Sequence, residues 1–205
     1  MKKDIVLFVL IEPFADWEGA ALAAELQKPS LDNPEKTFTV KTVSLSHEPI
    51  KSIGGFTVVP DYSLEDAPED YAALILIGGD SWRKPESAAV AALVQQALAK
   101  DVVVGAICDS TTFMAKHGFL NSVRHTGNIL NDLTSFGGEA YTNKDGFELE
   151  DAVRDGNLIT ANGNAQIQFG KLVLDALNAD PEGNQMWFDF HTMGLHPALR
   201  KYGWE

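Results

Sequence analysis

The chain has 205 residues, of which 45% are hydrophobic and 22% charged, a composition typical of globular proteins. This length suits one core of good size, so we expect residues 1–205 to form a single domain. The formal net charge of −13 disfavours nucleic acid and anionic membranes as partners, because both would repel the chain.

The amino terminus begins with lysines and an apolar run, Ile5–Ile11, which is the order found in signal peptides. The run is short and Glu12 follows it, so we expect a buried first strand instead. No apolar stretch approaches the roughly 20 residues of a membrane span. The single cysteine, Cys108, cannot form an internal disulfide, and neither CxxC nor HExxH occurs. We therefore expect a cytoplasmic protein with no metal and no cofactor.

Short apolar runs of strand length recur along the chain and are rich in β-branched residues. Such continuous runs suit strands that are covered on both faces, as in a parallel sheet. The expected strands are Ile5–Ile11, Phe38–Leu45, Ala72–Ile77, Val102–Ile107 and Leu158–Ala161.

Helical patterns separate these strands. Apolar residues at helical spacing predict helices over Asp16–Lys28, Pro85–Lys100 and Asn164–Leu177, with Asp16 and Asn164 as N-caps. The alternation of strand and helix is the pattern of right-handed βαβ units around a mostly parallel sheet. We therefore expect an α/β fold.

Three segments fall outside this alternation. Residues 49–60 indicate a small hairpin with Gly54 and Gly55 at the turn, and residues 137–155 indicate edge strands and turns. Residues 181–205 form a C-terminal extension that concentrates aromatic side chains. We expect one or two helices there, packed on the domain or on a partner.

Cys108 stands at the end of an apolar strand, and Asp109, Ser110 and Thr111 after it are natural helix starters. This strand–nucleophile–helix order lifts a side chain above the carboxyl edge of a sheet. The helix N-terminus there is expected to lower the pKa of the thiol. A buried cysteine that serves only as a small hydrophobic residue is the alternative.

Two further segments end at the same edge of the expected sheet. Gly78 and Gly79 close one strand and let backbone N–H groups approach an oxyanion, although for a glycine pair alone an ordinary tight turn is the favoured interpretation. Glu18 lies at the start of the helix after the first strand, where a surface carboxylate that stabilises the helix dipole is the alternative. Ligands of open parallel sheets bind at this edge, so the three features together favour a functional site.

In this order the segments resemble the ThiJ/PfpI family, within the class I glutamine amidotransferase-like superfamily. The resemblance covers about residues 4–178 and rests on FADWEGA, LILIGGD, VVVGAICDSTTFMAKHGFL, NSVRHTGN and DGNLITANGNAQIQFGKLVLDAL. It implies a flavodoxin-like three-layer α/β/α sandwich that associates as a homodimer.

The resemblance also implies a role for each candidate residue. Cys108 matches the family's nucleophile, and Glu18 matches the glutamate that forms a hydrogen bond with it. The backbone amides of Gly79, Asp109 and, less directly, Gly78 match an oxyanion site. Burial and like charge should raise the pKa of Glu18, so that the protonated carboxyl donates to the thiolate and later moves protons.

The chain departs from the family pattern at two positions. Asp109 stands where protease-like members carry a histidine, and His196 lacks the following glutamate of glutamine amidotransferases. Both protease and glutamine amidotransferase activity are therefore disfavoured. His125 is the remaining candidate imidazole, with Thr126 and Asn128 as polar neighbours, because relatives without the adjacent histidine often bring one towards the pocket. A surface or strand-end histidine is the alternative.

Three hypotheses for function remain open. The first is a cysteine-dependent hydrolase or lyase, glyoxalase/deglycase-like, in which Cys108 attacks a small-molecule carbonyl or amide substrate. The second is a non-catalytic, redox-responsive stress protein in which Cys108 is oxidised. The third is a binding module that keeps the fold but not the chemistry, and Asp109 beside the thiol favours it.

Overall fold

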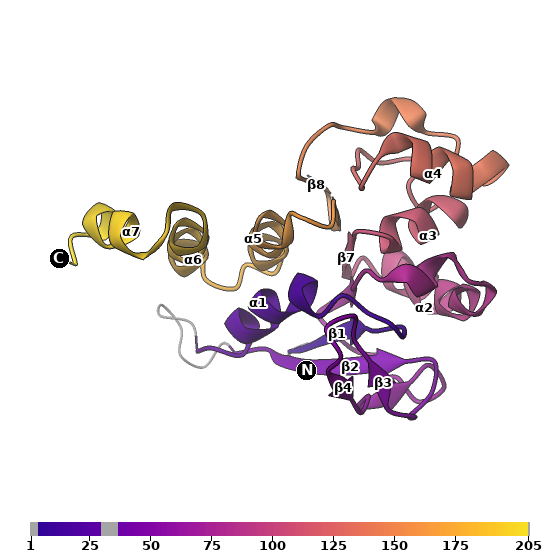
Figure 1. Ribbon diagram of the computed structural model, residues 1–205, viewed down its shortest axis with the longest axis horizontal. Coiled ribbons are helices and arrows are strands. Elements are labelled where there is room, and N and C mark those ends of the chain that lie inside the picture. Colours follow the sequence, from indigo (N-terminus) through magenta and orange to yellow (C-terminus); the bar gives the residue numbers. More distant parts are fainter. Residues whose placement is uncertain (1–3, 30–36, 205) are drawn as a thin grey trace.

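The computed structural model describes residues 4–29 and 37–204, with a seven-stranded sheet at the centre (Figure 1). The strands of this sheet are Ile5–Val9 (β1), Thr39–Ser44 (β2), Tyr62–Ser63 (β5), Ala73–Leu76 (β6), Val103–Ile107 (β7), Ala152–Asp155 (β8) and Leu158–Ala161 (β9). Their order is β5-β2-β1-β6-β7-β9-β8, and every neighbouring pair is parallel except β8 with β9. Each strand predicted from the apolar runs is present within its predicted limits.

Helices and short 3-10 turns connect the strands. The α-helices are Asp16–Leu26 (α1), Ala91–Ala99 (α2), Ser110–Lys116 (α3), Leu130–Gly137 (α4), Gln166–Ala176 (α5), Pro181–Met193 (α6) and Leu195–Tyr202 (α7). The 3-10 helices are Asp80–Arg83 (η1), Pro85–Val90 (η2), Gly138–Ala140 (η3) and Lys144–Gly146 (η4). The predicted hairpin is the antiparallel pair Ile50–Lys51 (β3) and Thr57–Val58 (β4).

The local predictions were wrong at several helix boundaries. Asp16 is the first residue of α1, whose N-cap is Ala15, and its carboxylate accepts a hydrogen bond from the Gly54 amide at 3.3 Å instead of capping the helix. Asn164 likewise lies outside α5, whose N-cap is Ala165. The first turns of the predicted 85–100 helix are the 3-10 helix η2, and α4 was not predicted at all.

Both faces of the sheet are buried, which explains why its strands read as continuous apolar runs. In β1, Leu7 and Val9 belong to one core, and Val6 and Phe8 belong to the other. Helices α2, α3 and α4 cover the first face, whereas α1, α5 and α6 cover the second (Figure 1). The fold is therefore the expected flavodoxin-like α/β/α sandwich, and its strand order corresponds to the doubly wound pattern.

The C-terminal segment packs on the second face through α6. Asp180 caps this helix by accepting the Gly183 amide at 3.0 Å, and Pro181 occupies its first position. Trp187 is only 6% exposed and belongs to the core beneath α5 and α6. Within the described residues, no helix is both long and apolar enough to cross a membrane.

Candidate active site

Cys108 occupies a sharp turn between β7 and α3. Its φ is +61°, in the left-handed region that a non-glycine residue enters at a cost of about 1 kcal/mol or more. The Ser110 hydroxyl donates to the carbonyls of Ile107 and Leu76, at 2.7 and 3.0 Å, and so ties the turn to the sheet. The turn lifts the thiol to the carboxyl edge of the sheet, as expected of a nucleophile elbow.

Glu18 lies in the first turn of α1 and is 1% exposed. Its Oε2 accepts the Gly78 amide at 2.8 Å. Its Oε1 is buried and has no N–H or O–H donor among the described residues. The Cys108 thiol is the other hydrogen-bond partner of the Glu18 side chain. A Cβ on Gly78 would lie 2.5 Å from Glu18 Oε2 and 2.6 Å from Cys108 Cβ, so only glycine allows this pair to meet.

The carboxyl and the thiol influence each other's ionisation. Burial raises the pKa of Glu18 to about 7, against hydrogen bonds from Cys108 and Gly78. Burial and the charge of Glu18 raise the pKa of the Cys108 thiol to about 12. The expected lowering of the thiol pKa is therefore wrong, because burial and the Glu18 charge outweigh the hydrogen bonds from the Asn128 side chain and the Asp109 amide. The expected rise at Glu18 has the predicted direction.

The directions of these two pKa shifts favour the proton on the Cys108 sulfur when Glu18 is ionised. Above pH 7 the ionised Glu18 accepts a hydrogen bond from the protonated Cys108 thiol, so the carboxylate is placed to take the thiol proton. A carboxyl with a pKa near 7 suits both general base and general acid at neutral pH. The pair can therefore move one proton from sulfur to a substrate atom.

The backbone amides expected to bind an oxyanion are not all free to do so. The Asp109 amide interacts with the sulfur of Cys108 and favours the thiolate. Gly79 lines the cavity beside the thiol, with a φ of +147° and no room for a Cβ next to the Pro13 carbonyl. The Gly78 amide is already bound to Glu18 Oε2, so the expectation that it serves an oxyanion is wrong.

His125 is not oriented towards the thiol, contrary to the expectation that it supplies an imidazole. Its ring is fully buried, with Nδ1 2.9 Å from the Val123 carbonyl and Nε2 2.7 Å from the Tyr141 hydroxyl. Burial lowers its pKa and favours the neutral form. The same segment instead delivers Asn128, whose Nδ2 lies 3.4 Å from Cys108 Sγ.

Gly163 is a site residue that the sequence reading missed. Its amide donates to Asn128 Oδ1 at 2.9 Å, which orients the Asn128 side chain towards the thiol. A Cβ at Gly163 would lie 2.9 Å from Cys108 Sγ and 3.3 Å from Glu18 Oε1. A glycine just after strand β9, like the Gly78-Gly79 pair after β6, was the available signal.

Asp109, the residue after the nucleophile, turns its carboxylate towards Arg83 and not towards the thiol. Nε and Nη2 of Arg83 lie 2.6 and 2.7 Å from the two oxygens of Asp109. No local pattern pointed to this pair, because the two residues are separated by a strand and two helices.

A cavity of about 530 Å³ opens above the Cys108–Glu18 pair. Trp17 and Ile53 form an apolar rim and are 48% and 47% exposed, whereas Trp82 is buried in the core. The remaining lining residues are Ala15, Gly79, Asp80, Arg83, Asp109 and Asn128. Among the residues described, no three metal-ligating side chains cluster together.

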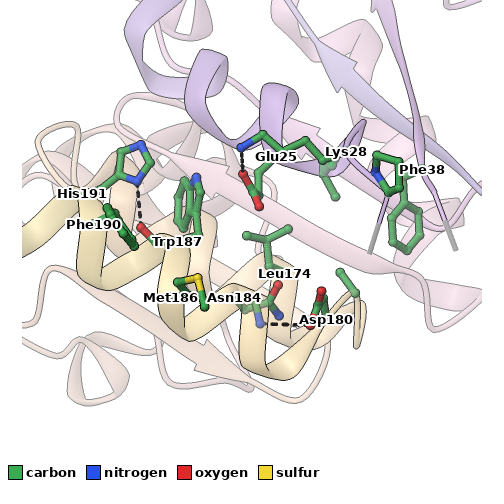
Figure 2. Close-up of a pocket in the computed structure, with 14 residues that line it drawn as sticks. Glu25, Lys28, Phe38, Leu174, Asp180, Asn184, Met186, Trp187, Phe190 and His191 are labelled. Carbon is green, nitrogen blue, oxygen red and sulfur yellow. Dashed lines mark hydrogen bonds and ion pairs between the residues drawn. The ribbon is translucent and has the colours of Figure 1, made fainter. Parts of the chain in front are cut away.

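A second cavity, of about 320 Å³, lies on the other face of the sheet between α1, α5 and α6 (Figure 2). Its walls include Leu26, Phe38, Leu174 and Trp187, and neither Cys108 nor Glu18 lines it. This apolar cavity is therefore separate from the candidate active site.

Comparison with known proteins agrees with this architecture. A model of the DJ-1/PfpI family matches residues 4–176. The chain is 37% identical over 205 residues to the uncharacterized protease YdeA of Bacillus subtilis (strain 168), which covers 99% of this chain and 98% of that protein. It is 31% identical over 190 residues to the uncharacterized protease YoaZ of the same strain, with 89% and 88% covered.

Solved structures give the same assignment. A ThiJ/PfpI family protein from Bacillus anthracis superposes with a TM-score of 0.90 at 28% identity, covering 98% of this chain and 95% of that one. A DJ-1 superfamily protein from Agrobacterium tumefaciens superposes with a TM-score of 0.82 at 31% identity, covering 92% and 98%. By sequence and by fold, the chain belongs to the DJ-1/PfpI family.

Proposed function

We propose that the protein is a cysteine-dependent enzyme, a hydrolase or a glyoxalase/deglycase-like lyase, that acts on small carbonyl or amide compounds. The observation that carries this proposal is the contact between an elbow cysteine at positive φ and a fully buried carboxyl oxygen without another donor. A buried carboxyl oxygen that has only a weak thiol donor is costly for folding alone, and a role in proton transfer accounts for it.

The chemistry follows from this pair. The sulfur of Cys108 forms a bond to the carbonyl carbon as the thiol proton passes to Glu18, and the carbonyl π pair moves onto oxygen. The amide of Gly79 supports the developing negative charge, and Glu18 returns the proton to that oxygen. An aldehyde gives a hemithioacetal in this way. With an ester or amide, the negative oxygen instead re-forms the carbonyl, and the alcohol or amine leaves with the proton held by Glu18. Water then gives a proton to Glu18 and adds to the thioester, and the acid leaves as that proton returns to sulfur.

The cavity supports small substrates over peptides. Its volume is about 530 Å³, and its apolar rim is formed by Trp17 and Ile53. The Bacillus subtilis relatives carry the name protease. In this chain, however, Asp109 follows the thiol and is bound to Arg83, and His125 is bound elsewhere. A peptidase thiol needs an imidazole within reach, so we do not extend that activity to this protein.

The binding-module alternative also has one observation in its favour. A thiol whose pKa is raised to about 12 is mostly protonated at neutral pH and is a weak nucleophile until a base acts on it. The two proposals differ in what Glu18 does. A catalytic Glu18 changes the pH profile of Cys108 reactivity, whereas a module needs no such coupling.

Replacement of Cys108 provides the direct test. Wild type and Cys108→Ser are incubated with a small 2-oxoaldehyde and with a small activated ester, and substrate loss is followed by absorbance. We expect Cys108→Ser to lose at least about 100-fold in turnover, since a hydroxyl is a far weaker nucleophile without a stronger base. Glu18→Gln should lose a similar amount. Glu25→Gln, on the same helix but at the second cavity, is the control and should remain active. Full turnover by well-folded Cys108→Ser would exclude the mechanism.

A further inference from the structure

Arg83 connects three elements around the active-site cavity. It is the last residue of η1, which begins directly after Gly79, and it lines the cavity itself. Its guanidinium binds both oxygens of Asp109 through Nε and Nη2, and Nη2 also lies 2.9 Å from Asp132 Oδ2 on α4. The Phe136 ring lies 4.2 Å from the guanidinium carbon, which supports the plane of the group by a cation–π contact.

The Arg83 contacts affect the thiol through Asp109. It is only 8% exposed and directly follows the nucleophile. A nearly buried carboxylate needs a partner, and an unpaired one so close to Cys108 would oppose a thiolate. Its charge already acts on the site, since it raises the pKa of Glu18.

We propose that Arg83 is a positioning residue for Cys108: it holds the Asp109 carboxylate away from the sulfur and keeps the Asp109 amide directed at it. This inference rests on the proposed function, because it assigns Arg83 a role through the reacting thiol. In this chain Arg83 thus neutralises the carboxylate of Asp109, so that an aspartate beside the nucleophile does not suppress the thiolate. The same bond fixes the start of α3 relative to η1, and both residues line the cavity.

The charges around Cys108 determine whether loss of Arg83 favours the thiol or the thiolate. Helix α1 supplies Glu18, the segment before α4 supplies the uncharged Asn128, and the β9–α5 loop supplies Gly163. The charged groups that face the thiol or its immediate neighbours from the other elements are Asp80, Arg83, Asp109 and Asp132. Arg83 is thus the cation among several carboxylates, so its loss shifts the balance towards the protonated thiol.

The test is the rate of Cys108 alkylation by iodoacetamide between pH 7 and 10, followed by mass spectrometry. Iodoacetamide is uncharged, so the rate reports the thiolate fraction and not attraction of the reagent. We expect Arg83→Gln to react about three- to tenfold more slowly than wild type at pH 8, with its profile displaced to higher pH. Adding Asp109→Asn to Arg83→Gln removes the unpaired carboxylate and should restore most of the rate.

Two controls separate a positioning role from a general loss of stability. Arg124→Gln removes the same charge from an exposed ion pair with Glu148, outside the cavity, and should leave the profile unchanged. Arg83→Lys keeps the charge without the two-point geometry and should lie between wild type and Arg83→Gln. Thermal unfolding of each variant confirms that the native fold is retained.

The possible failures can be distinguished. A wild-type alkylation rate that does not rise with pH over this range overturns the proposed function and this inference with it, because a thiol whose pKa is about 12 gains thiolate at every step of the range. A reactive wild type with an unchanged profile in Arg83→Gln overturns the role of Arg83 alone. Slow alkylation of Arg83→Gln that Asp109→Asn does not restore would also overturn it, because the carboxylate would then not be the cause.

Discussion

The two cavities of this protein differ in chemistry more than in form. The one above Cys108 brings a thiol, carboxylates and an arginine to the carboxyl edge of the sheet. The one beneath α6 lies between α1, α5 and α6 and is lined by aliphatic and aromatic side chains together with Glu25, Lys28, Asp180, Asn184 and His191 (Figure 2). Helix α1 contributes to both, with Glu18 at its first turn and Leu26 at its end. A cavity alone therefore does not mark the reactive site, whereas the contact between the buried Glu18 carboxyl and the Cys108 thiol does.

Removing a large side chain from the apolar cavity should have the largest effect on stability. Trp187 is 6% exposed and packs against Gly170 and His191, so Trp187→Ala should lower the free energy of unfolding by about 3–5 kcal/mol. Urea denaturation measures this loss. Trp17→Ala at the rim of the polar cavity is the control and should cost less than about 1 kcal/mol.

Cys108 alkylation should stay within about twofold of wild type in Trp187→Ala, because neither Cys108 nor Glu18 lines this cavity. A large change in thiol reactivity would show that the two cavities are coupled, and the comparison between them would then be wrong.

The pH dependence of stability should have opposite signs in the two regions. The pKa of Glu18 is raised from 4.5 to about 7 by burial, so its contribution is present below pH 4.5 and lost as pH rises to about 7. At about 1.4 kcal/mol per unit, the loss is about 3 kcal/mol, and Glu18→Gln should abolish it. Urea denaturation at several pH values measures the slope.

Asp189 in α6 has a pKa shift of the opposite direction to that of Glu18. Hydrogen bonds from Lys201 and Tyr202 lower its pKa, so its contribution is present at neutral pH and lost as pH falls through its folded pKa. Asp189→Asn should change only the loss of stability at acid pH. If the loss of stability between pH 4.5 and 7 persists in Glu18→Gln, another group causes it.

Adding one methyl group beside the thiol should have the smallest effect on stability and a selective effect on reactivity. A Cβ at Gly163 meets Cys108 Sγ at 2.9 Å, so Gly163→Ala should slow iodoacetamide alkylation about tenfold by displacing the sulfur from Asn128. Gly170→Ala is the counterpart at the second cavity, where the Cβ meets Trp187 at 2.8 Å. It should alter stability and leave alkylation unchanged. The reverse result would contradict the placement of Gly163 in the site.

The sequence by itself determined the sheet and the elbow, whereas the Glu18–Cys108 pair came from the resemblance to the family. The sheet and the elbow rest on local patterns: continuous apolar runs for buried parallel strands, and a cysteine followed by helix starters. Parallel topology then places the carboxyl ends of the parallel strands at one edge, which brought Glu18, Gly79 and Cys108 to the same side of the expected sheet.

Only the tertiary structure decided which polar groups face the thiol. His125 pairs with Tyr141, the Gly78 amide is bound by Glu18, and Gly163 approaches the sulfur. Arg83 reaches Asp109 and Asp132 across elements that no local pattern connects. Burial also reversed the expected thiol pKa, because desolvation and a neighbouring charge depend on the whole fold and not on the residues beside Cys108 in sequence.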